Sequence, residues 1–326
     1  MTTTALYTGV SDIAKERAAL ESGCSVYELS RAKIRLTGGD RMRWLNGMVT
    51  NNIRDLAVNH GTYNFLLNAK GRIDGDLYAY NLGDTLMVDT DESERENVLA
   101  FFDKYIIMDD VAVADESAVL TAIGVTGPQT REVLGAAGID APELAPLELG
   151  TPKCDCPCDC LQCTLVRGDD PAGHAYEIWI APGMVKSTWD ALVAAGATPV
   201  GTKTLEQRRI ELGIPRYGAD IRDRDLPQET GQDRAMNFTK GCYLGQEIVE
   251  RIRSQGQVHR MLMKLAVAGA GVAAGAKIVS GEREVGEITS VAGGPGGNGM
   301  TPAMGYLRRE FADKELSVSG AKVVVR

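Results

Sequence analysis

Short runs in which apolar and polar residues alternate occupy the first hundred residues, and this period of two is typical of half-buried strands. VYELS and KIRLTG predict two strands, and residues 62–90 predict a series of strands that turn at Gly71 and Gly83. Between these runs, GDRMRWLNGMVTNNI predicts the opening of a helix. The first part of the chain therefore mixes strands with helices.

Helical spacing follows from about Ser93 to Asp103, where Val98, Leu99 and Phe102 would share one face. The chain then repeats the alternation. VLTAIGVTG and YEIWIAP predict strands, whereas PQTREVLGAAG, MVKSTWDALVAAG and PVGTKTLEQRRIELG predict helices. This order predicts a second region of mixed α and β structure.

Beyond Gln257 the helical period disappears, and short β-rich runs such as EVGEITSV and SVSGAKVVVR are separated by glycine-rich turns. GGPGGNGM lacks the strand and helix that flank a phosphate-binding loop, so we interpret it as a turn. The pattern predicts an α+β protein with a C-terminal β-barrel. Its expected domains are residues 1–116 (α+β), 117–250 (α+β) and 251–326 (barrel).

Composition and charge narrow the class of protein. The chain has 326 residues, 44% of them hydrophobic, which is enough for more than one core. Its net charge of -9 argues against a protein that binds nucleic acid directly. No apolar run of about 18 residues and no cationic leader followed by an apolar segment is present, so we expect a cytoplasmic protein without membrane contact.

One segment carries a candidate reactive thiol. Cys242 precedes a run in which Leu244, Ile248, Val249 and Ile252 fall on one helical face, so it would lie just before, or at, a helix N-terminus. The helix dipole and the ammonium of Lys240 would both favour the thiolate, which is the nucleophilic and metal-binding form. The alternative is a small buried cysteine. The motif also contains Gly241, Gly245, Gln246 and Glu247.

KGCYLGQE resembles the K-G-C-x-x-G-Q-E signature of YgfZ-type folate-binding proteins, which are related to the glycine-cleavage T protein. Further segments resemble superfamily landmarks in the same order, among them GGDRMRWLNGMVTNNI, LEQRRIELGIPRYGADI and MGYLRR. The resemblance implies a ring of two related α+β domains and a β-barrel, with tetrahydrofolate, or a one-carbon derivative of it, in the central hole. It also ties Cys242 to the maintenance of iron-sulfur proteins.

Under this resemblance, Glu211 occupies the position of the carboxylate that accepts hydrogen bonds from the pterin edge. The alternative is an exposed glutamate at a helix end, paired with Arg208. A flat ring and an anionic tail also call for aromatic walls and cations. The candidate walls are Tyr63, Tyr217 and Tyr243, and the candidate cations are Lys240, Arg251 and Arg253.

T proteins usually show a pattern like G-G-I-x-D-D-L, in which one Asp is linked to the transfer chemistry. This chain has GRIDGDL at residues 71–77, so Gly75 replaces one acidic residue while Asp76 matches the second. We therefore retain Asp76 as a candidate catalytic residue, together with Cys242 and Lys240. Folate-dependent aminomethyl or methyl transfer stays open as an alternative function.

Five cysteines form a cluster at Cys154, Cys156, Cys158, Cys160 and Cys163. Soft thiolates select Zn²⁺ or an iron-sulfur cluster, but the spacing differs from the paired C-x-x-C knuckles of zinc sites. The alternatives are metal binding and an accessory loop of unknown role.

The leading hypothesis is a tetrahydrofolate-binding accessory protein that supports iron-sulfur cluster assembly or repair through Cys242, with transient contact to a cluster. Its partners would be iron-sulfur client proteins, including RNA-modifying enzymes. A folate-dependent transferase and a metal-binding scaffold built on the cysteine loop are the two competing hypotheses.

Overall fold

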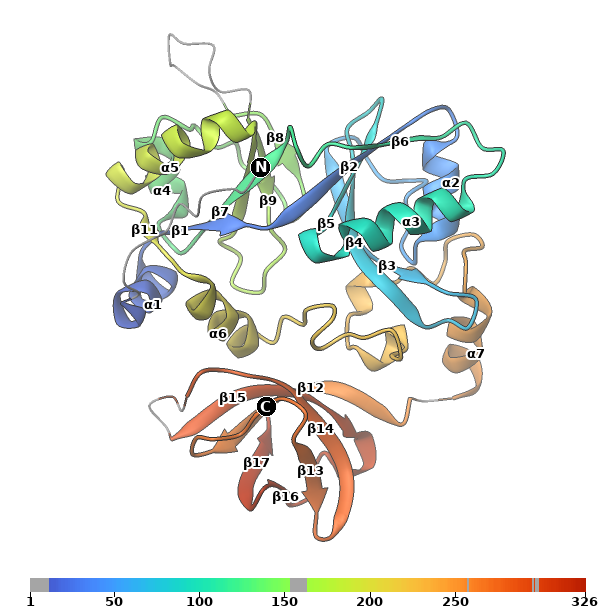
Figure 1. Ribbon diagram of the computed structural model, residues 1–326, viewed down its shortest axis with the longest axis vertical. Coiled ribbons are helices and arrows are strands. Elements are labelled where there is room, and N and C mark those ends of the chain that lie inside the picture. Colours follow the sequence, from blue (N-terminus) through green and yellow to red (C-terminus); the bar gives the residue numbers. More distant parts are fainter. Residues whose placement is uncertain (1–11, 153–162, 257, 295, 297–298) are drawn as a thin grey trace. The chain divides into compact units, whose positions relative to one another are not determined.

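The computed structural model of the protein describes residues 12–152, 163–256, 258–294, 296 and 299–326 (Figure 1). The chain divides into two compact units whose segments interleave. The first unit comprises Met1–Leu45, Ile53–Thr62 and Leu77–Thr204, and the second comprises Asn46–Asn52, Tyr63–Asp76 and Leu205–Arg326. The predicted domain boundaries and the arrangement of three domains in a ring stay predictions.

A six-stranded sheet lies in the first unit, with the strand order β11-β1-β7-β10-β9-β8. Its pairs are antiparallel, except for the parallel pair of β1 and β11. The strands are β1 (Ser25–Leu29), β7 (Thr121–Thr126), β8 (Leu149–Gly150), β9 (Thr164–Arg167), β10 (Tyr176–Ile180) and β11 (Thr198–Pro199).

Two helices, α4 (Thr130–Ala136) and α5 (Val185–Ala194), lie beside this sheet (Figure 1). Leu134 and Leu192 are fully buried against Val26 and Ile178 of the sheet. Both helices are amphipathic, so covering one sheet face removes their apolar sides from water.

A five-stranded sheet has the order β3-β4-β5-β2-β6. In the first unit, Tyr80 of this sheet meets Trp179 of the six-stranded sheet edge to face, with ring centres 5.1 Å apart. Beside Trp179 the fully buried Lys33 ammonium pairs with Asp89, so the buried charge is compensated. The strands are β2 (Arg31–Thr37), β3 (His60–Leu67), β4 (Ile73–Asn81), β5 (Leu86–Asp91) and β6 (Ala112–Asp115).

The predicted helix near Ser93 is confirmed as α3 (Arg95–Tyr105). Its buried face consists of Val98, Phe101 and Phe102. Leu99 is only half-buried, so the prediction was wrong for that one residue. Phe102 packs edge to face on Trp44, which explains why that side is turned inward. The remaining helices are α1 (Ile13–Ser22), α2 (Arg41–Met48), α6 (Thr202–Leu212) and α7 (Gln246–Gln255).

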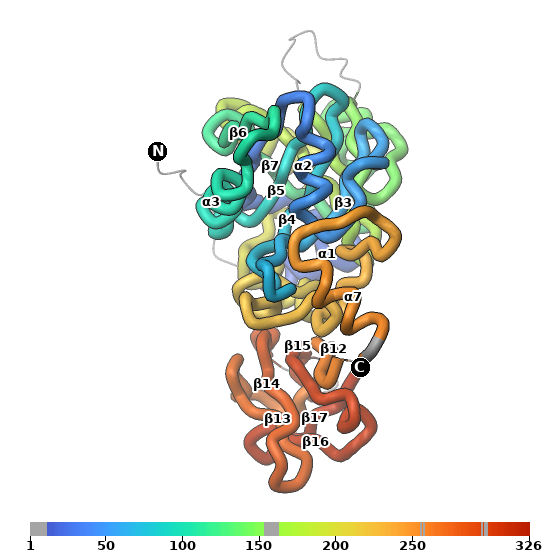
Figure 2. Tube along the Cα trace, turned by 90° about the vertical axis from the view of Figure 1, so that its right-hand side faces the viewer, coloured from blue at the N-terminus to red at the C-terminus, as the bar shows by residue number. Residues whose placement is uncertain are grey.

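The C-terminal strands form a closed barrel in the order β12-β15-β14-β13-β16-β17, grouped in red and orange in Figure 2. Leu265, Val267, Ile288 and Leu307 fill its core. The mixed α+β class with a C-terminal barrel is confirmed. The strands are β12 (Arg260–Ala268), β13 (Lys277–Ser280), β14 (Arg283–Val291), β15 (Met300–Arg308), β16 (Leu316–Val318) and β17 (Ala321–Val325).

SVSGAKVVVR holds two strands, because Ser319 and Gly320 both take positive φ and form a two-residue hairpin loop. Part of GGPGGNGM, at residues 295 and 297–298, lies outside the described residues. None of the helices in the described ranges combines the length and the apolar character needed to span a bilayer.

Candidate functional site

All the predicted thiol-motif and folate residues lie in the second unit. The thiol motif forms an extended loop that leads into α7, which begins at Gln246. Cys242 is exposed and lies just before this helix, as the sequence predicts. Val249 is buried, and Ile248 and Ile252 are half-buried on the expected apolar face. The prediction was wrong for Leu244, which lies in the turn before the helix. The amphipathic helix thus holds the end of the loop against the rest of the unit.

Gly245 at the start of α7 requires glycine for two reasons. Its φ of 81° is left-handed, and a Cβ there would lie 2.6 Å from the carbonyl oxygen of Asn68. The turn that contains Asn68 also holds Gly71, where a Cβ would lie 2.7 Å from Cβ of Ile248. Two glycines therefore allow this turn and the thiol motif to touch.

Lys240 ties the thiol loop to residues 46–51. Its Nζ donates hydrogen bonds of 2.6 Å to the carbonyl oxygens of Asn46, Val49 and Asn51. An ammonium has three donors, so these bonds use all of them. The ammonium also lies 5.0 Å from the ring centre of Tyr243. In this geometry Lys240 positions the loop that carries the thiol.

Tyr243, next to the thiol, is buried and fixed. Its backbone N–H donates to Oε1 of Gln246 at 3.0 Å, and Leu244 N–H donates to the carbonyl oxygen of Gly47 at 3.0 Å. Burial, with a further contribution from the charge of Glu250, raises the pKa of Tyr243 to about 12. Cys242 is thus exposed between anchored neighbours, which gives a defined position to an accessible sulfur.

Asp76 and Tyr63 form the second predicted cluster. The Tyr63 hydroxyl donates to Oδ2 of Asp76 at 2.6 Å, a short bond typical of an ionised acceptor. The Arg234 guanidinium lies over the Tyr63 ring, 4.4 Å from its centre. Nearby, Asp74 accepts a hydrogen bond of 2.9 Å from Nδ2 of Asn68. The structure therefore joins Tyr63 to Asp76 directly.

Arg234 and Asn51 are site residues that the sequence analysis missed. Nδ2 of Asn51 donates to the carbonyl oxygens of Tyr63 (3.2 Å) and Arg234 (2.8 Å), so it holds the stacked pair together. Because these bonds go to main-chain oxygens, the partner side chains carry no signal of them. The only hint is the Asn-Asn pair in VTNNI.

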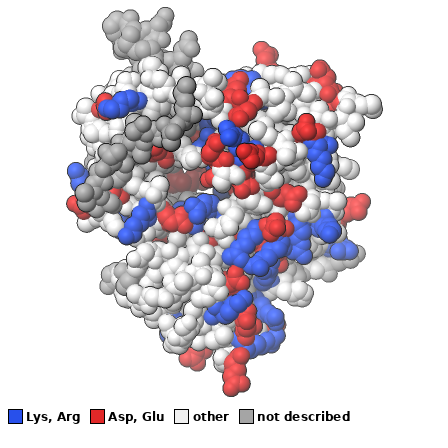
Figure 3. Space-filling view, in the orientation of Figure 1, with Lys and Arg blue, Asp and Glu red and all other residues white. Residues whose placement is uncertain are grey.

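Glu211, Tyr217 and Arg251 are placed on three different segments. Glu211 is half-buried in the last turn of α6, and half-buried Tyr217 forms a single bridge with Ile221. Arg251 is exposed on α7, together with Arg253 and Glu247. Figure 3 shows Lys and Arg side chains gathered in the region of α7 and of the segment before it. Their roles in folate binding stay predictions.

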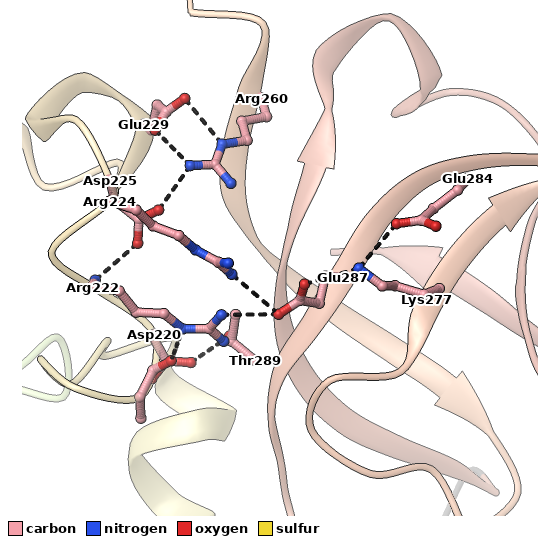
Figure 4. A network of polar contacts seen from close by, with 11 residues as sticks. Asp220, Arg222, Arg224, Asp225, Glu229, Arg260, Lys277, Glu284, Glu287 and Thr289 are labelled. Atoms are coloured by element: carbon pink, nitrogen blue, oxygen red, sulfur yellow. Dashed lines mark hydrogen bonds and ion pairs between the residues drawn. The ribbon is translucent and has the colours of Figure 1, made fainter.

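Charged side chains connect the segment between Glu211 and the thiol loop to the barrel (Figure 4). Arg222 donates to Glu287 at 2.9 Å, and Arg260 lies 2.8 Å from Asp225 and 3.0 Å from Glu229. Burial raises the pKa of Asp225, whose side chain is fully enclosed. This network fixes the path of the chain between two predicted parts of the site.

The cysteine cluster lies mostly outside the described residues, which include only Cys163 of its five members. Cys163 is buried in the core beside the six-stranded sheet. Among the described residues, no group of three or more His, Cys, Asp or Glu side chains is arranged to hold a metal ion. Metal binding by the cluster and an accessory loop of unknown role both stay open as alternatives.

Comparison with known proteins identifies the family. Residues 6–240 match the family described as the GCVT N-terminal domain, which is more than half of the chain. The chain belongs to this family. The aminomethyltransferase of Herpetosiphon aurantiacus is 28% identical over 80% of this chain and 72% of its own length. The aminomethyltransferase of Thermosynechococcus vestitus is 28% identical over 94% of this chain and 84% of its own length.

The GCVT fold extends beyond the matched domain. Glycine cleavage system aminomethyltransferase T from Bartonella henselae superposes with a TM-score of 0.83, covering 96% of this chain and 87% of that one at 19% identity. This likeness includes the C-terminal barrel and confirms the predicted fold class. The chain is thus a member of the aminomethyltransferase superfamily, as the motif resemblance predicted.

Proposed function

We propose that this GCVT family member binds tetrahydrofolate and supports iron-sulfur proteins through Cys242. The exposed sulfur is the observation that supports this proposal most strongly. The side chains of Lys240 and Gln246 and the buried Tyr243 anchor the loop around it, whereas Cys242 itself is accessible. An inert structural cysteine would instead be enclosed by apolar side chains, as Cys163 is.

The side chains of the second unit fit a folate in their chemistry. Glu211 supplies a half-buried carboxylate for the pterin donors, and the half-buried Tyr217 supplies an aromatic face, whereas the Tyr63 ring is buried under Arg234. The exposed Arg251 and Arg253 would attract the anionic glutamate tail. Bound tetrahydrofolate would supply the carrier for a one-carbon unit, and the protein residues would orient it. The aminomethyltransferases among the relatives support this assignment.

Aminomethyl transfer is the second candidate function. The hydrogen bond of 2.6 Å between Tyr63 and Asp76 favours it, because it orients the carboxylate that matches the second acidic position of the T protein pattern. The names of the relatives also favour it. In this case Asp76 would be the catalytic residue, and Cys242 would be dispensable.

A pair of variants separates the two functions. We expect Cys242→Ala to keep tetrahydrofolate affinity and to lose rescue of an iron-sulfur enzyme in cells that lack the protein. Asp76→Asn should retain that rescue. The matched control is Gly241→Ala, which lies in the same loop and whose added Cβ would meet no atom within 4 Å. Full rescue by Cys242→Ala would reject the thiol role, and loss of aminomethyl transfer in Asp76→Asn alone would establish the second candidate.

Folate binding needs its own measurement. Glu211→Gln removes a charged acceptor and should weaken tetrahydrofolate binding by about 10- to 100-fold, since a hydrogen bond to a charged group contributes about 1.5–3 kcal/mol. Calorimetric titration of the full chain gives the dissociation constant. Glu247→Gln, an exposed carboxylate on α7, is the control. Equal affinities for both variants would remove Glu211 from the site.

A further inference from the structure

A hollow on the barrel shares Arg260 and Glu229 with the charged network described above, but it includes neither Cys242 nor any predicted folate residue. Its volume is about 980 Å³, and three arginines, one histidine, one valine and two glutamates line it. The basic side chains come from the start of β12 (Arg260, with His259 just before it) and from the end of β15 (Arg308, with Arg309 just after it). Two strand ends thus bring basic side chains to one place.

The strand register brings two of these cations face to face. Arg260 and Arg308 are direct cross-strand partners, and the N–H of Arg309 donates to the carbonyl oxygen of His259 at 3.0 Å. Like charges in directly opposed positions repel each other. A negative charge beside these two strand ends would reduce that repulsion.

Only part of that charge is supplied by the protein. Arg260 is neutralised by Asp225 and Glu229, with which it forms the upper part of the network in Figure 4. Glu310, the other carboxylate of the hollow, lies 3.6 Å from Arg283. Within the described part of the chain, the exposed guanidinium groups of Arg308 and Arg309 have no ion pair or hydrogen bond.

We propose that this hollow binds a small oxyanion with two or more negative charges, a phosphate ester or a polycarboxylate, through Arg308 and Arg309. Each guanidinium presents a planar set of N–H donors that matches the paired oxygens of phosphate and carboxylate. Binding would give Arg308 and Arg309 the negative partner that the described residues do not supply. The site is separate from Cys242 and Glu211, so it goes beyond the proposed function.

Titration of the full-length protein with pyrophosphate and, separately, with citrate tests this site. At low ionic strength we expect the wild type to bind at least one of them. The double variant Arg308→Ala/Arg309→Ala should bind it at least tenfold more weakly. The control, Lys314→Ala/Lys322→Ala, removes two exposed charges from the same barrel away from the hollow and should bind like the wild type.

Each outcome has a defined meaning. Tighter binding of pyrophosphate assigns the site to phosphate esters, and tighter binding of citrate assigns it to polycarboxylates. The proposal is overturned if neither anion binds the wild type, or if the control loses as much affinity as the arginine variant. If the double variant does not fold, the single variant Arg308→Gln gives the same comparison with the shape of the surface largely kept.

Discussion

Lys240 and Asn46 are separated by 194 positions in the chain, yet the Lys240 ammonium donates a hydrogen bond of 2.6 Å to the Asn46 carbonyl oxygen. Two further carbonyls, of Val49 and Asn51, receive the other two donors. A side chain that was expected to lower the pKa of a thiol thus anchors the loop that presents it. The anchoring leads directly to a stability prediction.

Replacement of Lys240 by Met should lower the free energy of unfolding by about 2–3 kcal/mol, because three carbonyl oxygens lose a charged donor. Urea unfolding followed by circular dichroism measures the change. Lys70→Met, at an exposed lysine of the same unit, should change stability by less than about 0.5 kcal/mol. Equal effects of the two substitutions would show that the three bonds do not hold the loop.

Two glycines of the thiol motif should respond differently to alanine. Gly245→Ala meets both a left-handed φ and a carbonyl oxygen 2.6 Å from the new Cβ, so we expect a loss of about 2 kcal/mol or more. Gly241→Ala has no atom within 4 Å of its Cβ and should be close to neutral. The melting temperatures of the two variants test this prediction. It is wrong if Gly245→Ala is as stable as Gly241→Ala.

The bond between Tyr63 and Asp76 should appear as a coupling energy. A double-mutant cycle with Tyr63→Phe and Asp76→Ala should give a coupling of about 1–3 kcal/mol, as expected for a hydrogen bond to a charged group. Tyr63→Phe keeps the ring under Arg234, so the stacking contact serves as an internal control. A coupling near zero would mean that the bond is not formed in solution.

Alkaline pH should destabilise the protein partly through Tyr243. Its pKa is about 12 in the folded state because of burial and the charge of Glu250, against about 10 in an unfolded chain. Between pH 10 and 12 the unfolded state therefore binds fewer protons, and stability falls as pH rises. The stability of Tyr243→Phe should fall less steeply over this range. If the free energy of unfolding fell equally steeply with pH in the wild type and in Tyr243→Phe, Tyr243 would not be the source of this pH dependence.

The ion pairs of the barrel network should differ in strength according to burial. Arg260→Met leaves the fully enclosed Asp225 carboxylate uncompensated and should lower stability by about 3–5 kcal/mol. Arg224→Met removes a half-exposed partner 3.4 Å from Glu287 and should change stability by about 0–1 kcal/mol. Urea midpoints of the two variants test this, and similar losses would show that burial does not set the strength of these pairs.

Local patterns determined much of the fold from the sequence alone. Alternation between apolar and polar residues predicted the barrel, and the helical spacing after Cys242 predicted α7, because each pattern reflects which side of an element faces a core. The continuous motif KGCYLGQE indicated the aminomethyltransferase superfamily, whereas the choice between an exposed and a buried Cys242 stayed open until the structure showed it exposed. α3 shows the limit, since Phe101 and not Leu99 completes its buried face.

Tertiary structure alone decided how the site is held together. The amide of Asn51 and the ammonium of Lys240 bind main-chain oxygens, which every residue possesses, so their partners leave no trace in the sequence. The stacking of Arg234 on Tyr63 and the unneutralised Arg308 likewise follow from distances that only the folded chain defines. Patterns record burial one element at a time, whereas hydrogen bonds and charge balance depend on which distant segments meet.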